Sequence, residues 1–388
     1  MEWIELGELG KVSTGNTPSK KKIEYYNEKY IELVKPSNFT ENMIVSIESG
    51  EEYLSKEGKS KGRVAEIGDI LVTCIGNIGN VGIASKEVCF NQQVNSIKVD
   101  KKKVLSKYVA YSILYIKPAL NHVANKAVVP IINKSTFEKI KIPVPPMEIQ
   151  KKIVEVLDEA QKLIDNRKKQ IELLDDLIES IFYDMFGDPV KNDKGWEVKK
   201  LGEVTRFIDY RGKTPPTQDN GVLLITAKNI GKKHFKKEPV EYISKELYKK
   251  RMTRGFPKAN DVLFVTEGAT MGFVCRVPRN IREFSVGQRI ITFVCKETLR
   301  EEYLHYFIYD RIFQDEISRK ATGSSAKGIR ASELKKIDII IPPLQLQNQF
   351  AEKVQAIETQ KELLQESLKL MEDNYNSLMQ RAFKGELF

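Results

Sequence analysis

The segment Ile142-Pro143-Val144-Pro145-Pro146-Met147-Glu148-Ile149-Gln150 reveals the organisation of this chain, because it occurs twice. The second copy, Ile339-Ile340-Ile341-Pro342-Pro343-Leu344-Gln345-Leu346-Gln347, lies 197 positions later. Each copy opens a stretch without proline or glycine, 147–186 in the first and 344–384 in the second. Proline suits the first turn of a helix and glycine suits its end. The repeated segment therefore predicts two long helices.

Apolar residues recur within both stretches at steps of three and four, the spacing of a coiled-coil seam. Arg167, Gln170 and Lys361 fall in or beside the seam, where polar side chains either fix the register or extend to solvent. Each helix is expected to pack antiparallel on the other, because the second starts where the block after the first ends. Forty residues at about 1.5 Å each give a rod of roughly 60 Å. The predicted seam comprises Ile153, Val156, Ala160, Leu163, Leu174, Leu177 and Ile181, and then Phe350, Val354, Ile357, Leu364, Leu368, Met371, Tyr375 and Leu378.

The blocks before each helix also resemble one another. Leu9-Gly10 matches Leu201-Gly202, and residues 68–72 match 260–264, both 192 positions apart. Short β-rich runs at 31–34, 69–73 and 94–99 have counterparts at 222–225, 261–265 and 289–294, and helices are expected at 107–115 and 301–313. The fold class is therefore α+β with an internal pseudo-two-fold repeat. Two similar globular mixed α/β domains, 1–146 and 187–343, are separated by long helices, 147–186 and 344–388, that form an antiparallel coiled coil.

Charge is divided between the domains and the helices. Counting Lys and Arg against Asp and Glu, the net charge is +5 for 1–146, −4 for 147–186, +11 for 187–343 and −2 for 344–388. Basic blocks that mix Lys and Arg with amide and aromatic residues attract polyanions by releasing counterions. The alternative is the solvated surface of an alkaline protein.

Other features exclude several classes. The chain is 41% hydrophobic, so disorder is excluded, and no stretch reaches the roughly 18 apolar residues of a spanning helix. The N-terminal residues lack the pattern of a secretion signal. Four scattered cysteines without a CxxC pair, and three histidines far apart, argue against a zinc cluster and fit a reducing cytoplasm.

Polar loops at matched positions of the two blocks are the candidate binding residues. Glycine permits close backbone approach, Asn, Gln and Arg can read base edges, and Lys and Thr suit phosphates. Ordinary surface loops remain the alternative. The candidates are Asn16, Lys20, Lys21, Lys22, Ser37, Asn38, Asn77, Asn80, Gln92 and Gln93 in the first block, and Arg211, Lys213, Thr214, Lys228, Asn229, Lys232, Lys233, Gln288, Arg289, Ser324, Ser325, Lys327 and Arg330 in the second.

Catalytic motifs are missing from the sequence. No GxxxxGK[ST] loop occurs, and the glycines at 76, 79 and 82 are not followed by the helix and acidic residue of a dinucleotide site. The Pro-Pro pairs lack the acidic or amide residue before them and the aromatic after them that an amino-methyltransferase needs. Asp188 with Glu197-Val198-Lys199 suggests a nuclease, but the first block has no counterpart. We therefore expect a binding protein without catalytic residues and without a metal site.

The order of basic domain, Pro-Pro-initiated helix, basic domain and Pro-Pro-initiated helix resembles the specificity subunit of type I restriction–modification enzymes. The matching elements are the two Pro-Pro segments, Gln150 and Gln347, residues 185–189 (Met-Phe-Gly-Asp-Pro), and Trp196 followed by Leu201-Gly202. The resemblance covers essentially the whole chain. One departure is that the Glu-Gln pair at the family's helix start is here Glu148-Ile-Gln150 and Gln345-Leu-Gln347.

The resemblance implies two target-recognition domains, each reading one half of a split double-stranded DNA site. The helices would set the spacing and dock two methylation subunits, followed by two restriction and motor subunits. The cofactors S-adenosylmethionine, ATP and Mg²⁺ would lie on those partners, and none on this chain. A different class remains open, a non-catalytic dumbbell-shaped scaffold that binds RNA or acidic proteins. Only a DNA reader would bind one duplex sequence far more tightly than others.

Overall fold

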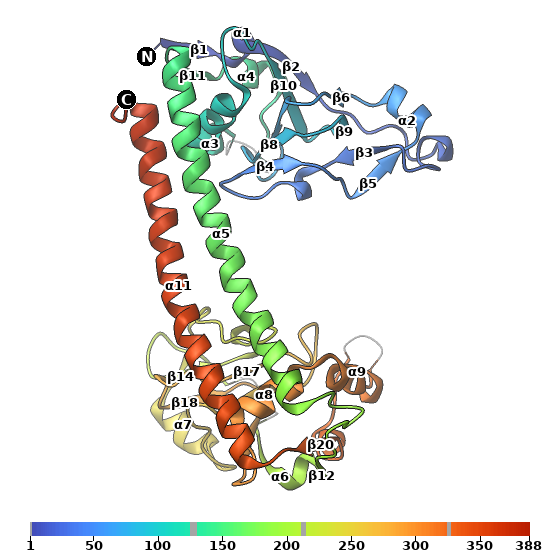
Figure 1. Ribbon diagram of the computed structural model, residues 1–388, viewed down its shortest axis with the longest axis vertical. Helices are drawn as coiled ribbons and strands as arrows, with labels where there is room; N and C mark the ends of the chain where they lie inside the picture. The colour runs from blue at the N-terminus through green and yellow to red at the C-terminus, as the bar shows by residue number, and fades with distance from the viewer. Residues whose placement is uncertain (1, 125–129, 211–214, 324–326) are drawn as a thin grey trace. The chain divides into compact units, whose positions relative to one another are not determined.

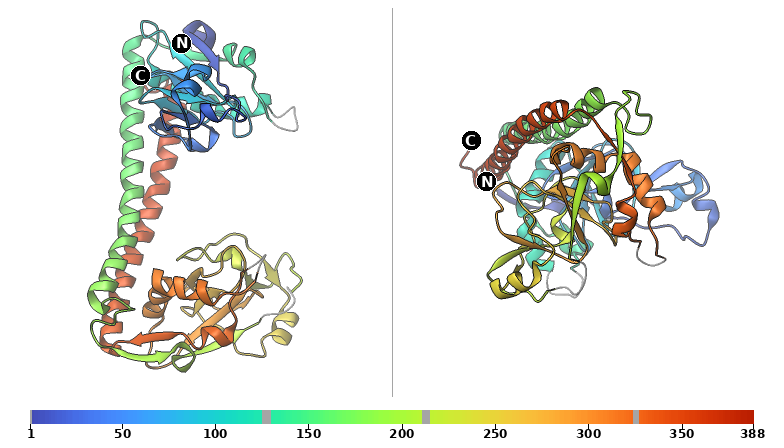
Figure 2. Two further views of the ribbon diagram at one scale, coloured as in Figure 1. Left: turned by 90° about the vertical axis from the view of Figure 1, so that its right-hand side faces the viewer. Right: turned by 90° about the horizontal axis from the view of Figure 1, so that it is seen from below.

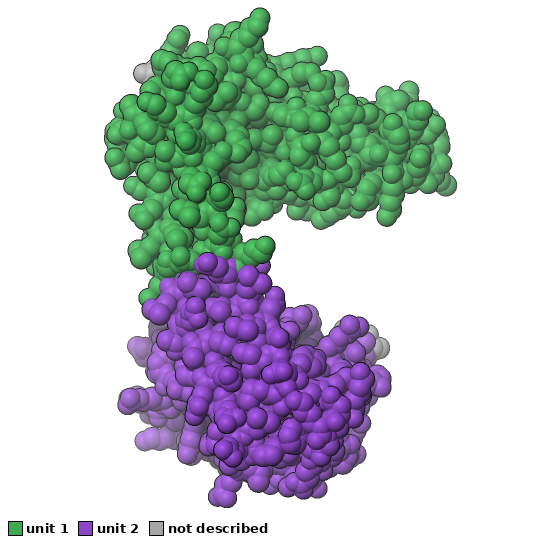
Figure 3. All heavy atoms as spheres, in the orientation of Figure 1, with its two compact units in different colours: residues 1–169, 365–388 green, residues 170–364 purple. Residues whose placement is uncertain are grey.

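The structure is a computed structural model that describes residues 2–124, 130–210, 215–323 and 327–388. It contains two compact units, residues 1–169 with 365–388, and residues 170–364 (Figure 3). The two longest helices, α5 (Met147–Phe186) and α11 (Leu344–Lys384), each contribute to both units. Each unit therefore combines one globular domain with parts of both helices.

The first unit has three sheets. β1 (Glu2–Glu5) pairs with β11 (Lys141–Val144), which closes the domain by joining its two ends antiparallel. A five-stranded sheet has the order β2-β10-β7-β8-β4, and a four-stranded sheet the order β5-β3-β9-β6. The remaining bounds are β2 Gly10–Thr14, β3 Ile31–Val34, β4 Ile44–Ile47, β5 Glu52–Leu54, β6 Val64–Ala65, β7 Ile70–Thr73, β8 Val81–Ala84, β9 Val88–Phe90 and β10 Val94–Val99, with helices α1 Leu6–Leu9, η1 Ile23–Tyr25, η2 Pro36–Asn38, α2 Lys56–Lys61, α3 Ser106–Ala124 and α4 Lys134–Glu138.

The second unit repeats this plan with fewer strands. β12 (Glu197–Lys200) pairs antiparallel with β20 (Asp338–Ile341), and the two larger sheets have the orders β13-β19-β16-β17 and β15-β14-β18. These orders equal β2-β10-β7-β8 and β5-β3-β9 of the first unit. The other bounds are β13 Thr205–Asp209, β14 Val222–Ile225, β15 Tyr242–Ile243, β16 Val262–Val265, β17 Val274–Arg276, β18 Phe284–Val286 and β19 Ile290–Cys295, with helices α6 Leu201–Val204, η3 Ala227–Asn229, α7 Lys245–Arg251, α8 Glu301–Tyr309, α9 Arg311–Lys320 and α10 Ala331–Leu334.

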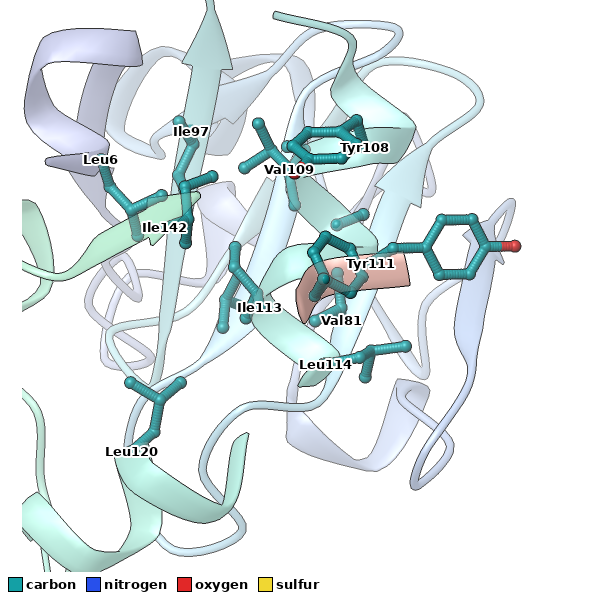
Figure 4. Close-up of a cluster of buried hydrophobic side chains, with 14 of the residues drawn as sticks. Leu6, Val81, Ile97, Tyr108, Val109, Tyr111, Ile113, Leu114, Leu120 and Ile142 are labelled. Carbon is teal, nitrogen blue, oxygen red and sulfur yellow. The ribbon is translucent and has the colours of Figure 1, made fainter. Parts of the chain in front are cut away.

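The predicted fold class is thus confirmed, down to the central strands. Every residue of β7 and β16 is buried, so both faces of each strand are covered, which is why Thr73 is the one polar residue among them. In the first unit α3 places Tyr108, Val109 and Ile113 against the sheet, where Val81 and Ile97 belong to the same core (Figure 4). Ends of the long helices complete each core, because Phe383 lies 5.4 Å from Tyr108 and Phe186 lies 4.8 Å from Tyr303, measured between ring centroids.

Within each unit the two long helices lie side by side and run antiparallel (Figures 1 and 2). In the second unit Lys361 Nζ lies 2.6 Å from both carboxylate oxygens of Asp175, and Phe350 packs on Phe182 and Phe186. In the first unit Lys168 and Glu372 form an ion pair of 3.0 Å. Lys361 therefore crosses the seam to a carboxylate, the register-fixing alternative, instead of extending to solvent.

The seam on α11 lies where the sequence predicts it, with Phe350, Val354, Ile357 and Tyr375 buried and Leu364, Leu368, Met371 and Leu378 half-buried. On α5, Ile153 is buried, and Val156, Ala160, Leu174 and Ile181 are half-buried.

Two predicted seam positions on α5 are wrong by one residue. Leu163 and Leu177 are 49% and 44% exposed, whereas their neighbours Ile164 and Ile178 are buried. Heptad steps from Leu157, which is fully buried, lead to Ile164 and Ile178 and not to the leucines. The sequence offers two adjacent apolar stripes, and only packing distinguishes them.

No helix in the described part of the chain is long and apolar enough to cross a membrane.

All four cysteines are free, and Cys74, Cys89 and Cys275 are buried. Burial raises the pKa of the Cys89 thiol to about 11, so this group is held as the unreactive thiol.

Candidate nucleic-acid interface

Three loops of the second unit meet beside the end of β16, the strand that lies between β19 and β17. The backbone N–H of Thr266 donates to Arg289 O at 2.9 Å, and that of Gly268 donates to Lys327 O at 3.0 Å. The N–H of Ile329 returns to Thr266 O at 2.9 Å. Residues 266–272, 287–289 and 327–330, here called the second-repeat face, are thereby held together although they are far apart in sequence. This arrangement gathers the predicted residues Gln288, Arg289, Lys327 and Arg330.

The first unit builds the same arrangement from different residues. The N–H of Cys74 donates to Gln93 O at 2.8 Å, and that of Gly76 donates to Pro130 O at 3.1 Å. The N–H of Ile132 donates to Cys74 O at 2.9 Å. Residues 74–80, 91–93 and 130–132, the first-repeat face, gather the predicted residues Asn77, Asn80, Gln92 and Gln93.

The two faces carry polar side chains, and several of these are exposed. Arg289 Nε lies 3.3 Å from Glu267 Oε1, and both side chains are about half exposed. Such surface ion pairs contribute little, so the guanidinium can exchange this carboxylate for another acceptor. Lys327, Arg330, Asn77 and Gln92 are exposed. Gln92 Oε1 accepts a hydrogen bond of 2.7 Å from Thr17 Oγ1, which links the first-repeat face to the loop after β2.

Several predicted amides are instead used inside the loops. Asn229 is buried, accepts from Thr226 N at 2.9 Å and donates to Pro239 O at 2.8 Å. Asn38, its counterpart in the first unit, accepts from Lys35 N at 2.9 Å. Asn16 donates to Lys61 O at 2.8 Å and accepts from Arg63 N at 2.8 Å. These side chains shape the loops and would have to give up their present bonds to reach a base.

Asn80 is also buried, and it receives a hydrogen bond of 2.7 Å from Lys117 Nζ. Lys117 donates to Asn42 as well, at 3.2 Å. Burial lowers the pKa of Lys117. Lys117 and Asn42 were not predicted from sequence, although a lysine on the otherwise apolar face of α3 was a signal that this position is polar for a reason.

The predicted lysines divide by environment. Lys20 pairs with Glu52 at 3.0 Å and Lys228 with Glu241 at 3.2 Å, while Lys21 is exposed. Lys22 lies over the ring of Tyr25, 5.3 Å from its centroid, and is also exposed. Ser37 is exposed on η2. These groups are available to phosphates at the modest cost of a surface ion pair.

Lys232 and Lys233 both lie over the ring of Tyr309, at 5.9 Å and 5.0 Å from its centroid. Lys233 also contacts Glu179 of α5 at 2.9 Å. Burial lowers the pKa of Lys233, but the hydrogen bond to Glu179 and the nearby charges of Asp175 and Glu179 together outweigh it, so the pKa is raised and the ammonium persists. Lys232 is exposed and Lys233 half-buried, so only Lys232 presents its charge fully to solvent. Five predicted residues, Arg211, Lys213, Thr214, Ser324 and Ser325, lie outside the described residues.

A groove adjoins the glycine loop of each face. In the first unit it has a volume of about 510 Å³ and is lined by Asn42, Asn77, Lys117 and Asn121, among others. In the second unit a groove of about 370 Å³ is lined by Met271, Tyr306, Tyr309 and Gln314, among others. The two grooves occupy equivalent places but have different chemistry, amide-rich in one and aromatic in the other. In the described part of the chain, no group of three or more His, Cys, Asp or Glu residues is placed to hold a metal ion.

Residues 1–175 and 193–372 match the type I restriction modification DNA specificity domain, and the chain belongs to that family. The MjaIX type I restriction enzyme specificity subunit of Methanocaldococcus jannaschii is 27% identical over 409 residues, covering 99% of this chain and 92% of the relative. The EcoR124I/EcoR124II specificity subunit of Escherichia coli is 28% identical over 198 residues, covering 46% of this chain and 48% of the relative.

Solved structures share the fold. The S subunit of a type I restriction–modification system from M. genitalium superimposes with a TM-score of 0.56 at 12% identity, covering 99% of this chain and 96% of that one. A chain from a study of complex assembly and conformational transition of the type I system gives a TM-score of 0.60 at 18% identity, covering 100% and 98%. At these identities the likeness is one of fold.

Proposed function

We propose that this chain is the sequence-specific, double-stranded DNA-binding subunit of a type I restriction–modification complex and that it recognises a bipartite target. Each domain would read one half-site through its face, and α5 and α11 would set the spacing between the half-sites. The observation that carries this proposal is the pair of faces. Their backbone bracing is the same, but their exposed side chains differ, with Asn77 and Gln92 on one and Arg289 and Lys327 on the other.

Two domains that read different DNA sequences require loops with the same backbone hydrogen bonds but different exposed side chains. Backbone bonds fix each loop, and the side chains at its surface are free to diverge. Asn and Gln match the edge of adenine, whereas Arg matches the edge of guanine. The excess positive charge of both domains supports binding to phosphates, which positions a reader on its duplex.

The test is an exchange of one domain. Methylation-sensitive sequencing of host DNA first defines the target. Residues 187–343 are then replaced by the corresponding domain of another family member. We expect one half-site to change while the other half-site and the spacing are retained. A change in both half-sites, or equal binding to all duplexes as expected of a scaffold for RNA or acidic proteins, would refute separate readout.

Two methylation subunits, and then two restriction and motor subunits, are the proposed partners. Leu173 on α5 and Leu370 on α11 support this part, because they are equivalent in the repeat at the spacing of 197 and are 53% and 64% exposed. Exposed apolar side chains can mark the contact site for a partner. Two leucines at equivalent positions of the repeat therefore fit two copies of one partner. S-adenosylmethionine, ATP and Mg²⁺ would be held by the partners, this chain would contribute no catalytic residue, and the complex would act in the cytoplasm.

Native mass spectrometry with purified methylation subunits tests the docking. Leu173→Glu alone should leave a complex with one methylation subunit, and so should Leu370→Glu alone. The double variant should bind none. Glu172→Gln, an exposed change beside Leu173, serves as the control and should keep two copies. If either single variant retained two copies, the leucines would not be the docking positions.

A further inference from the structure

Ile23 is the most exposed of the large hydrophobic side chains described, at 77%, and it follows three lysines directly. It begins η1, a single turn in the loop between β2 and β3. An isolated exposed apolar residue is ordinary, but this one follows a run of three lysines in a domain of a DNA-specificity family, and the Glu24 carboxylate after it lies 4.0 Å from Lys22 Nζ. Lys21 and Lys22 are exposed beside it, and Lys20 is held only by its surface pair with Glu52.

The turn that presents Ile23 is rigid. Tyr25 N and Tyr26 N donate to Lys22 O and Ile23 O at 3.1 Å and 2.9 Å. Ser55, which is fully buried at the start of α2, donates its hydroxyl to Glu24 O and its N–H to Tyr25 O at 2.9 Å. A side chain on Gly58 would lie 2.4 Å from Tyr25 O, so α2 approaches the turn as closely as only glycine allows. The hydrogen bonds from Ser55 and the close packing of α2 therefore fix the turn and keep Ile23 exposed to solvent.

The turn is also joined to the first-repeat face. Tyr26 Oη donates to Pro18 O at 2.6 Å, and the preceding residue Thr17 holds Gln92. The loop that carries the tip is thus hydrogen-bonded to Gln92 of the first-repeat face, which limits how far Ile23 stands from that side chain. α2, β3 and β5 lie together at the same end of this unit (Figure 1).

The loop that carries this tip is longer than its counterpart in the second repeat. Residues 15–30 separate β2 from β3, whereas residues 210–221 separate β13 from β14. The first repeat therefore has four additional residues between these strands, and Lys20 to Ile23 lie in the longer loop. A loop lengthened in one repeat is the pattern expected of a feature that serves one half-site.

We infer that Ile23 is a wedge that enters the stack of a base step in the half-site read by the first domain, with Lys20 to Lys22 on the adjoining phosphates, and bends the duplex there. Apolar side chains flanked by basic residues unstack and kink DNA in this way, typically by about 20–90°. A rigid turn suits the role because the wedge must not fold back when it meets the stack. The bend belongs at a pyrimidine–purine step, which unstacks most easily. This inference rests on the proposed DNA-reading function.

The experiment uses the full chain, with its methylation subunits, on duplexes that contain the target. Energy transfer between dyes at the duplex ends reports bending, and 2-aminopurine placed through each half-site reports unstacking. We expect the wild type to bend the duplex and brighten 2-aminopurine at one step of the first domain's half-site only. Ile23→Ala should abolish both signals and weaken target binding by about tenfold, whereas Ile23→Leu should retain them. A mismatch at that step should restore binding by Ile23→Ala, because the step is then already unstacked.

Ile67→Ala is the matched control. Ile67 is 68% exposed in the same domain, but it follows Glu66, whose carboxylate pairs with Lys98, and no run of lysines precedes it. It should leave bending, unstacking and affinity unchanged, and thermal unfolding of both alanine variants should overlay that of the wild type. Straight DNA in a sequence-specific wild-type complex would overturn the wedge and leave the proposed function intact. Normal bending by Ile23→Ala would also overturn the wedge. The same holds if Ile23→Ala lost a bound protein subunit but kept the bend. Absence of any sequence preference would remove the proposed function and the wedge together.

Discussion

Gln150 and Gln347 form the same three hydrogen bonds at the starts of the two long helices. Gln150 Oε1 accepts from Leu105 N at 3.0 Å, and Gln347 Oε1 accepts from Arg300 N at 2.9 Å. Each amide nitrogen donates to the first proline of its Pro-Pro pair, at 2.9 Å and 2.8 Å, and to one further carbonyl. Both side chains are buried, so each glutamine fixes the first turn of its helix to the domain before it.

Loss of this clamp should be costly and local. Gln347→Ala leaves buried backbone groups without partners, at about 2–4 kcal/mol of unfolding free energy. The measurement is urea unfolding followed by circular dichroism. Gln360→Ala, an exposed position on the same helix, should lie within about 0.5 kcal/mol of the wild type. Equal stabilities for the two variants would mean that the clamp contributes nothing.

The repeated glutamines also show why some parts of the structure could be predicted from the sequence. Residues that match between the repeats are mostly structural: Gln150 with Gln347, Asn38 with Asn229, and the Pro-Pro pairs. They identified the fold because backbone geometry must be satisfied identically in both copies. Asn38 and Asn229 also match between the repeats, and each accepts a hydrogen bond that holds its own loop, so their role in DNA binding stays a prediction. We expect exposed positions that differ between the repeats to carry the readout.

What the sequence could not supply was the choice between near-equivalent packings and the contacts between distant loops. Leu163 and Ile164 are both apolar, and only the phase set by the partner helix decides which is buried. Lys117 meets Asn80 and Asn42 because a helix, a turn and a loop converge. Neither the phase of the helix packing nor the contacts of Lys117 can be predicted from a periodic pattern in the sequence.

The Lys361–Asp175 pair should be worth more than an exposed ion pair. Its side chains are only 21% and 23% exposed, and both carboxylate oxygens are engaged. A double-mutant cycle with Lys361→Ala and Asp175→Ala should give a coupling energy of about 1–2 kcal/mol, measured by urea unfolding. The exposed pair Lys336–Glu333 should give less than about 0.5 kcal/mol in the same cycle. Equal coupling would show that the seam pair does not fix the register.

Arg289 and Lys232 should differ in how they affect DNA binding. Arg289→Ala should cost about 1–3 kcal/mol on the target and relax one base position, because a guanidinium reads guanine through two hydrogen bonds. Lys232→Ala should weaken all sequences alike and reduce the salt dependence by about one counterion. Fluorescence anisotropy with cognate and random duplexes at several salt concentrations measures both. Parallel losses on cognate and random DNA for Arg289→Ala would make it a phosphate contact. Arg211, predicted for the same role, can be tested identically.

His305 should make the second unit sensitive to acid. Burial lowers its pKa from 6.5 to about 3, so between these values the unfolded chain binds a proton that the folded chain does not. Stability should therefore fall as the pH decreases through this window, by up to about 1.4 kcal/mol per pH unit. His305→Leu removes that contribution. The gap between wild type and variant, from urea unfolding at pH 7 and 4.5, should change by about 2–3 kcal/mol in favour of the variant. A gap independent of pH would exclude His305 as the cause.

The length of α5 and α11 should set the spacing of the two half-sites. The repeat offset is constant at 197 from the start to the end of both helices, while loops before them differ in length. Seam packing explains part of this, because one inserted residue rotates every later apolar side chain away from the partner. It does not explain why the two helices have nearly the same length, 40 and 41 residues, since a simple tether could differ at either end. A ruler requires it.

Inserting one heptad in each helix tests the ruler. The points between Lys169 and Gln170 and between Leu364 and Gln365 lie at the unit boundaries, so the contacts inside each unit, including Lys361–Asp175 and Lys168–Glu372, are preserved. Seven residues keep the stripes in phase and add about 10 Å, or close to three base pairs. Selection of bound duplexes from a pool with varied spacers should yield the same half-sites with a longer spacer. A four-residue insertion in α5 alone should disrupt the seam and prevent assembly. If the heptad variant selected the original spacer, the helices would be a flexible tether, because a rigid connection cannot lengthen without moving the half-sites apart.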